Sequence, residues 1–287
     1  MTPRYDINAN VNNRMLAHMF AMQNRANAAV NPDWHLAGNR WSRAIMVEGV
    51  ELLEHYGRWK WWKKQNANPD LGQCQLELVD IWHFALSYFM ARFEITDATD
   101  WVLNEAVMRQ IKIAQAKAEH LTPSDEAFNT AVDALVGAAA QGLFNTDAFF
   151  ALCAMVELPL DKLYAQYVGK NLLHVFRQQY GYKTGRYLKE WAGVEDNIVL
   201  EEVMAKCSHL SGEELEETLK QELLARYTKA CAADNWHCLE TSVGPVIGKM
   251  GVLPSAPSLG PILSTRAGIV YLDKPEQVLR PLPIFEA

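Results

Sequence analysis

The spacing of apolar residues over the first 240 positions constrains the fold more than any other feature of the sequence. Proline and glycine are sparse there, and apolar residues from Leu160 to Phe176 recur at i, i+3 and i+4 over four turns. Gly181 is placed to end that helix. No sustained alternation typical of a strand occurs before about residue 240. The sequence therefore predicts an all-α, multi-helix bundle of about eight to ten helices.

Two short motifs predict where individual helices begin. Thr122-Pro123-Ser124-Asp125 is typical of an N-cap followed by proline at the first helical position and an acid in the first turn. Ser211-Gly212-Glu213-Glu214 has the pattern of a capping box. The second motif predicts a helix that runs to about Ala230.

The last part of the chain has a different composition. From about Thr241, closely spaced glycines and prolines interrupt any helix. We therefore expect a helical domain over residues 1–240 and an irregular extension over 241–287, packed on the body or partly mobile. Within the extension, residues 268–272 are the best strand candidate, and a disordered tail is the alternative.

Composition excludes several classes of protein. The net charge of −7 argues against a binder of DNA or RNA, which needs a basic face to replace counterions. No run reaches the roughly 18 apolar residues of a membrane span, and no signal peptide is visible. The five cysteines include no Cys-x-x-Cys, and His237-Cys238 fits no standard zinc spacing. Reduced thiols and a cytoplasmic location are the expectation.

Two acidic pairs point to chemistry. Glu48 and Glu51 are spaced i, i+3 in one apolar helical segment, and Glu77 and Asp80 repeat this spacing in the next. On a helix, such spacing places both carboxylates on one face, with their Cβ atoms about 5–6 Å apart. The gap between the pairs suits an antiparallel helical hairpin connected by residues 58–69. Such pairs also occur on ordinary solvated helix surfaces, and that alternative stays open at this point.

Four carboxylates gathered among apolar residues repel one another and lose hydration, so cations must compensate them. Oxygen ligands favour hard ions, which makes Mg²⁺ the expected metal and Mn²⁺ a possible substitute. Because Mg²⁺ is commonly bound together with substrate phosphates, the pattern favours a site for a polyphosphate. Glu54 is expected to be solvated. His55 and His83 are expected to support or pack beside the site rather than to bind metal.

The segments around these acids resemble a known family. Trp59-Lys60-Trp61-Trp62-Lys63 and the run from Glu77 to Phe84, ELVDIWHF, are similar to strings of the dimeric, all-α dUTP pyrophosphatases, relatives of the MazG-type nucleotide pyrophosphohydrolases. The resemblance covers about residues 15–200. It also includes Gln23 with Asn27, Tyr167 to Asn171 followed by Arg177, and the segment from Gly181 to Asn197.

The resemblance implies a role for each matching residue. Glu48, Glu51, Glu77 and Asp80 would bind two or three Mg²⁺ ions, and Glu48 or Glu51 would help to activate the attacking water. The nucleotide would contact residues from several segments. Gln23 and Asn27 would lie at the uracil pocket near Trp59 and Trp61, Lys170 and Arg177 would meet the phosphates, and Tyr182, Lys183, Lys189 and Asn197 would close over the nucleotide, partly from the second subunit of a homodimer.

One position departs from the family pattern. His174 stands where the family usually has the second Asn of Lys-Asn-x-x-Asn. A neutral imidazole is a poorer partner for Mg²⁺ or phosphate than a carboxamide oxygen. The departure bears on the third metal position and on the phosphate contact of this residue.

The resemblance implies hydrolysis of dUTP to dUMP and pyrophosphate, and of dUDP as well, which would control the dUTP pool. Two alternatives stay open. A flipped amide at Gln23 would read cytosine, giving a dCTP or broader deoxynucleoside triphosphate pyrophosphohydrolase. A catalytically inactive helical binding protein is the other alternative, motivated by His174 and the extension.

Overall fold

The computed structural model describes residues 7–62, 68–93, 105–182, 187–207, 210, 212–233, 236–241, 244–252, 261–265 and 268–271. The chain divides into two compact units, residues 1–171 and 172–287, with the boundary inside helix α8. None of the described helices combines the length and the apolar character that a membrane-spanning segment requires.

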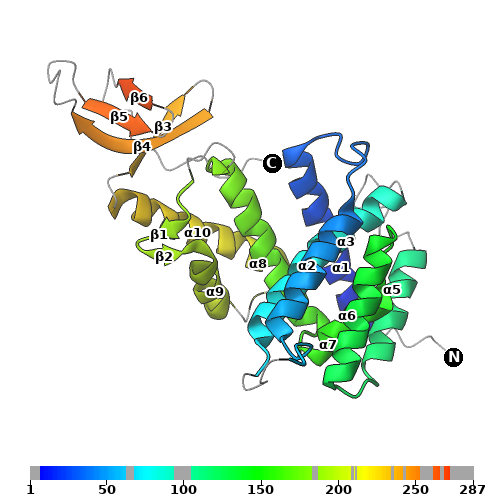
Figure 1. Cartoon of the computed structure of the whole chain (residues 1–287). Helices are drawn as coiled ribbons and strands as arrows, with labels where there is room; N and C mark the ends of the chain where they lie inside the picture. The colour runs from blue at the N-terminus through cyan, green and yellow to red at the C-terminus, as the bar shows by residue number, and fades with distance from the viewer. Residues whose placement is uncertain are drawn as a thin grey trace. The chain divides into compact units, whose positions relative to one another are not determined.

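The first unit is helical (Figure 1). The predicted all-α body is confirmed, and the described residues of the whole chain form nine helices. The helices of the first unit are α1 (Ile7–Val30), α2 (Trp41–Tyr56), α3 (Leu71–Arg92), α5 (Glu105–Ala118), α6 (Asp125–Ala140), α7 (Thr146–Met155) and α8 (Leu160–Gln179), which continues into the second unit.

The ends of these helices follow local sequence. The helix predicted at Thr122 begins two residues later, because Ser124 is the N-cap and its side chain accepts a hydrogen bond from the backbone N–H of Ala127 at 3.1 Å. Helix α8 ends before Gly181, as expected, and Gly181 has a φ of 87° that other residues rarely adopt.

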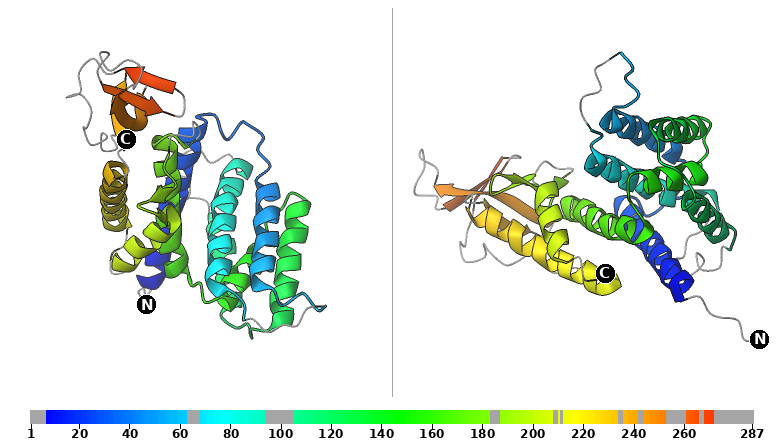
Figure 2. Two further views of the ribbon diagram at one scale, coloured as in Figure 1. Left: turned by 60° about the vertical axis from the view of Figure 1, so that its left-hand side comes forward. Right: turned by 90° about the horizontal axis from the view of Figure 1, so that it is seen from below.

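Helices α2 and α3 form the predicted antiparallel hairpin. The backbone N–H of Asp70 donates to the carbonyl of His55 at 3.2 Å, and one turn on, the Cys74 thiol lies 3.9 Å from the carbonyl of Leu52. Successive turns of α3 therefore contact successively earlier turns of α2, as in an antiparallel pair of helices. The two helices lie side by side in both views of Figure 2. Their acidic pairs are therefore brought to the same level.

The core of the first unit fixes this hairpin in place. Trp82 of α3 is fully buried and stacks on Phe149 of α7, with ring centroids 5.1 Å apart. On the other side, α2 packs against α6 at Gly49, where an added Cβ would lie 2.7 Å from a methyl carbon of Val136. A larger residue at position 49 would therefore push the two helices apart.

The second unit contains the end of α8, a short hairpin of β1 (Glu190–Trp191) and β2 (Val194–Glu195), and helices α9 (Asp196–Lys206) and α10 (Gly212–Ala233). The turn of this hairpin has positive φ at Ala192 and Gly193, as two-residue hairpin turns require. A cluster of aromatic rings forms its core: Phe176, Tyr180, Tyr187, Trp191 and Tyr227.

The C-terminal extension differs from the irregular structure expected there. Strands β3 (Trp236–Thr241), β4 (Gly244–Val252), β5 (Pro261–Thr265) and β6 (Gly268–Tyr271) form an antiparallel sheet in that order. Only β6 was expected. Proline disrupts helices but is tolerated at the start of a strand. Pro261 opens β5, and Pro245 is the second residue of β4, beside the turn from β3.

Candidate metal and nucleotide site

The hairpin brings three of the four predicted metal ligands together. One carboxylate oxygen from each of Glu48, Glu51 and Glu77 lies within 4.8 Å of the others. Glu77 is buried, Glu48 is half-buried and Glu51 is exposed, so the cluster opens to solvent on the α2 side. Three oxygen donors at this spacing can share one or more hard divalent cations.

The carboxylates of the cluster repel one another. Burial, and then the negative charges of Asp80, Glu51 and Glu77, raise the pKa of Glu48 from 4.5 to about 7. Burial and the charge of Asp80 likewise raise the pKa of Glu77. Within the described residues, Glu48 and Glu51 form no ion pair with lysine or arginine. A divalent cation would supply the missing positive charge, so these residues fit the predicted metal.

Asp80 lies near these acids but has a protein partner. Its Oδ2 atom is 2.5 Å from Nζ of Lys170, on α8. The predicted fourth metal ligand and the predicted phosphate-binding lysine are therefore paired with each other. Their roles toward metal and phosphate stay predictions, and binding of a nucleotide would require Lys170 to exchange or share this partner.

The residues expected to lie outside the metal site have other contacts than the acidic triad of Glu48, Glu51 and Glu77. Glu54 is exposed and forms an ion pair with Lys60, which also lies over the ring of Trp59 at 5.4 Å. His55 contacts the cluster, with Nε2 3.4 Å from a carboxylate oxygen of Glu77. An imidazole here can orient Glu77 by hydrogen bonding without binding metal itself.

The predicted uracil-binding amides lie in a hydrogen-bonded network between α1, α3 and α8. Gln23 Nε2 donates to Asn27 Oδ1 at 2.9 Å, and Asn27 Nδ2 donates to the hydroxyl of Ser87 at 2.9 Å. Gln23 Oε1 lies 2.8 Å from His83 Nδ1 and 2.9 Å from the hydroxyl of Tyr167. The structure thus brings Gln23 and Asn27 together.

Sequence reasoning left His83 and Ser87 out of this site. A signal was present: the i, i+4 spacing of Gln23 and Asn27 recurs at His83 and Ser87, so two helices each place a pair of polar side chains on one face. The sequence alone does not show that these faces of α1 and α3 lie against each other.

Helix α3 connects the acids to the amide network. Glu77 and His83 are six residues apart, a rise of about 9 Å along the helix axis. Helix α8 repeats this link, because Tyr167 binds Gln23 while Lys170 binds Asp80. The two groups of residues therefore lie along the same pair of helices, at a separation suited to a base at one end and phosphates at the other.

The tryptophans of the α2–α3 connection are partly exposed. Trp61 is 85 % exposed, and Trp62 packs edge-on against both Trp59 and Trp61. More than half of Trp62 is also exposed, so this indole is not part of the core. Its contacts are with the other two indoles of a surface cluster.

The remaining predicted residues belong to the second unit. Arg177 donates two hydrogen bonds of 2.8 Å to Asp196 and one of 2.9 Å to Asn197 Oδ1. Tyr182 is exposed, and the exposed Lys189 lies 3.6 Å from Glu195. His174 is half-buried on α8, and Lys183 lies outside the described residues. Their predicted contacts with a nucleotide stay predictions.

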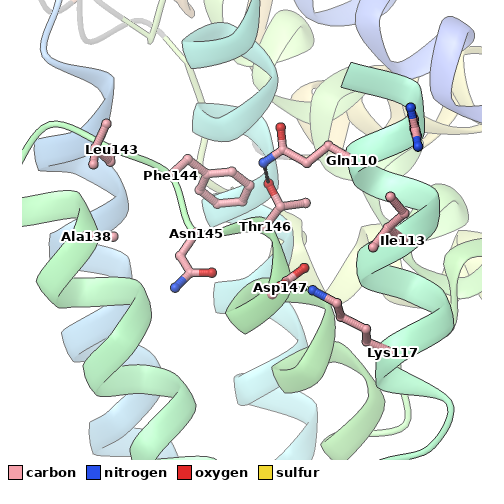
Figure 3. Close-up of a pocket in the computed structure, with 10 residues that line it drawn as sticks. Gln110, Ile113, Lys117, Ala138, Leu143, Phe144, Asn145, Thr146 and Asp147 are labelled. Atoms are coloured by element: carbon pink, nitrogen blue, oxygen red, sulfur yellow. Dashed lines mark hydrogen bonds and ion pairs between the residues drawn. The ribbon is translucent and has the colours of Figure 1, made fainter. Parts of the chain in front are cut away.

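A cleft of about 630 Å³, named the second cleft because it is separate from the candidate site, lies between α5 and the start of α7 (Figure 3). Its polar side chains bind each other: Gln110 donates to the Thr146 hydroxyl at 2.8 Å, and Lys117 pairs with Asp147 at 2.5 Å. None of the predicted site residues lines it. This cleft therefore adds nothing to the candidate site.

Comparison with models of protein families supports an assignment. A family model described as dUTPase matches residues 15–182, more than half of the 287-residue chain. The matched region contains the acidic triad, Asp80, Lys170 and the amide network. Comparison with curated proteins gave no match.

Proposed function

Because the chain belongs to the all-α dUTPase family, we propose that it hydrolyses dUTP to dUMP and pyrophosphate at the site formed by α2, α3 and the adjoining turns of α1 and α8. The observation that carries this proposal is the triad of Glu48, Glu51 and Glu77, whose oxygen atoms converge within 4.8 Å. The activity of dUTP diphosphatase follows from the family. The metal, the residues and the extent of the substrate range are our proposal.

Glu48, Glu51 and Glu77, joined by Asp80, would hold two or three Mg²⁺ ions, for which Mn²⁺ could substitute. When bound, such ions polarise the phosphoryl group and favour ionisation of water at the site. The raised pKa values of Glu48 and Glu77 support this assignment, because carboxylates so close together are stable as anions only beside a cation.

The side chains of the site then have distinct tasks. Glu48 or Glu51 accepts a proton from the attacking water through a carboxylate oxygen. The water oxygen bonds in line to one phosphorus of the α–β linkage, the bond from that phosphorus to the bridging oxygen breaks, and the bridging oxygen leaves with the other phosphoryl group, which gives dUMP and pyrophosphate. Lys170, 2.5 Å from Asp80, is placed to balance charge that grows on the phosphate oxygens. Gln23 and Asn27 hold the base.

We further propose that dUDP is a substrate, because recognition of the base and one metal-bound phosphate linkage suffices for the same cleavage.

A homodimer is also proposed. Val47 and Val50 are exposed on α2 beside the acids, and Trp61 and Trp62 are exposed on the following connection. Apolar groups gathered around a polar site are typical of a surface that a second chain covers. The free thiols of Cys74, Cys153 and Cys207 suit a reducing, cytoplasmic location.

A panel of nucleotides tests the proposal. Pyrophosphate release is measured with dUTP, dCTP, dTTP and UTP at equal concentration, with Mg²⁺ and with a chelator, and phosphate release is measured with dUDP. We expect turnover of dUTP and dUDP that requires Mg²⁺. Equal rates for dUTP and dCTP would establish the broader pyrophosphohydrolase, and no release with any nucleotide would contradict the proposed enzyme and favour the catalytically inactive alternative.

A further inference from the structure

A chain of hydrogen bonds that starts at a backbone carbonyl determines how the base-reading amides are oriented. The hydroxyl of Ser87 donates to the carbonyl oxygen of His83 at 3.1 Å. A carbonyl can only accept, so the single proton of this hydroxyl is used. The hydroxyl oxygen must therefore accept from Asn27, which requires the NH₂ group of Asn27 to face Ser87 at 2.9 Å.

The same logic passes from Asn27 to Gln23 and on to His83. With its NH₂ group on Ser87, Asn27 turns its Oδ1 atom to Gln23, so Gln23 must donate through Nε2 at 2.9 Å. Gln23 Oε1 is then an acceptor, and the ring nitrogen that faces it at 2.8 Å, Nδ1 of His83, must carry a proton. The chain thus begins at the carbonyl of His83 and ends at its imidazole.

The network resists the opposite orientation of the Gln23 amide. A flip would turn its oxygen toward the oxygen of Asn27, whose orientation Ser87 fixes, and would require the proton of the His83 imidazole to move from Nδ1 to the buried Nε2. Gln23 is 7 % exposed, His83 is 6 % exposed and Ser87 is fully buried. Water is therefore poorly placed to compensate either change, and a buried polar group without a partner is costly.

We propose that His83, together with Ser87, is a positioning residue that determines the choice of base, by holding the Gln23 amide with its N–H groups directed away from the imidazole. This inference rests on the proposed function. One hydrogen of Gln23 Nε2 and one lone pair of Asn27 Oδ1 are not used by the described bonds of the network. These are a donor for the 4-oxo group of uracil and an acceptor for its N3–H.

Cytosine presents the opposite pattern on that edge. Its 4-amino group is a donor and its N3 atom is an acceptor, so both would meet groups of the same kind. A site that leaves buried polar groups unpaired discriminates strongly against the wrong substrate. A freely flipping amide would accept either base, and the network removes that freedom.

The test combines kinetics with a spectroscopic measurement. In His83→Phe, the ring that packs 4.3 Å from the ring of Tyr167 is retained but the donor is lost. In His83→Asn, an N–H can replace that of Nδ1. We expect His83→Phe to lower the ratio of kcat/KM for dUTP over dCTP about tenfold or more, with the change for dUTP mostly in KM. His83→Asn should restore the ratio to within about threefold of the unmodified protein.

Two further variants and one spectroscopic measurement make the outcome unambiguous. Ser87→Ala removes the anchor with a smaller change in shape, and should lower the ratio even if His83→Phe does not fold. His18→Phe, which removes another histidine bonded to a tyrosine in the same bundle, is the matched control and should leave the ratio unchanged. Histidine ¹⁵N spectra of the unmodified, nucleotide-free protein should show His83 protonated at Nδ1.

The results separate this inference from the proposed function. If the unmodified protein hydrolyses dUTP but His83 is the Nε2–H tautomer, or the folded His83→Phe and Ser87→Ala variants keep the original ratio, the positioning role is wrong and the enzyme remains. If the unmodified protein releases no pyrophosphate from any nucleotide, the proposed function and the role built on it are both wrong.

Discussion

The carboxylates inside the two units have opposite electrostatic surroundings. In the second unit, Asp196 is fully buried, accepts two hydrogen bonds of 2.8 Å from Arg177 and accepts a third, of 2.7 Å, from Tyr187. In the first unit, Glu48 and Glu77 are crowded by other acids, which add to the effect of burial and raise the pKa of each. The second unit balances its buried negative charge with its own side chains, and the first unit concentrates negative charge at one place.

The ionisation of the neighbouring groups shows the same contrast. Although burial lowers the pKa of Arg177, its bonds to Asp196 outweigh that effect and raise it. Burial, and then Asp196, raise the pKa of the Tyr187 hydroxyl, which holds its proton firmly. A closed set of this kind stabilises a fold. A crowded set of carboxylates destabilises the protein when no cation is bound, and groups with strongly shifted pKa values cluster at functional sites.

The sharpest test of the comparison is removal of the buried acid of the second unit. Asp196→Ala leaves the half-buried guanidinium of Arg177 with the neutral amide of Asn197 but no carboxylate, and we expect a loss of about 3 kcal/mol in the free energy of unfolding. Chemical denaturation measures it. The matched control is Glu195→Ala, at the adjacent exposed residue 3.6 Å from Lys189, which should change stability by less than about 1 kcal/mol. Equal effects of the two variants would contradict the distinction.

Removal of an acid from the first unit should have the opposite signature. Glu48→Gln should lower kcat for dUTP about 100- to 1,000-fold, because it takes away a ligand and a candidate proton acceptor. The nucleotide- and metal-free variant should be at least as stable as the unmodified protein, because one repelling charge is gone. Glu54→Gln, on the same helix but exposed, is the control and should keep its activity. Activity of Glu48→Gln within a few-fold of the original would exclude the role of this residue.

The pH dependence of stability gives a smaller but more specific effect. Folding raises the pKa of Glu48 from 4.5 to about 7, so between these values the folded state binds more protons than the unfolded state. Its contribution to stability is therefore present at low pH and is lost as pH rises to about 7. Without metal, the difference in melting temperature between Glu48→Gln and the unmodified protein should grow from pH 5 to pH 7 and level off above it.

Saturating Mg²⁺ should raise the melting temperature of the unmodified protein more than that of the variant. A difference that is constant with pH would show that Glu48 ionises normally.

The smallest effect is expected at the second cleft, where both charges are exposed. Lys117→Ala removes the ion pair with Asp147 and should change the free energy of unfolding by less than about 0.5 kcal/mol, because solvent screens such pairs. Denaturation and the dUTP assay should both give values near those of the unmodified protein. A large loss of activity would indicate that this cleft, rather than the acidic triad, serves the reaction.

The sequence predicted the parts of the site that depend on spacing along one helix. The i, i+3 acids, their apolar helices and the hairpin between them follow from local periodicity, and the structure confirms that Glu48, Glu51 and Glu77 converge. Partners contributed by distant segments could not be predicted. The pairing of Asp80 with Lys170, and of Arg177 with Asp196, depends on how helices pack rather than on any short motif.

The C-terminal sheet was missed for a different reason. Glycine and proline exclude a helix, and that part of the expectation for residues 241–287 holds. Their presence does not exclude short antiparallel strands, because pairing partners rather than intrinsic preference decide whether such a segment forms a sheet. The sequence of Gly244–Val252 alone does not show that it pairs with strands on both sides.

The contact between Gly49 and Val136 limits how the reactive face of α2 can change. Glu48 and Glu51 flank the glycine, and the space behind it is already filled by the neighbouring helix. Any side chain at position 49 would tilt or lift α2, and both carboxylates would move with it. In a library of variants, activity should therefore be lost on substitution of Gly49 as it is on substitution of the acids, although Gly49 has no side chain to offer a substrate. The packing of α2 against α6 determines where the two carboxylates lie.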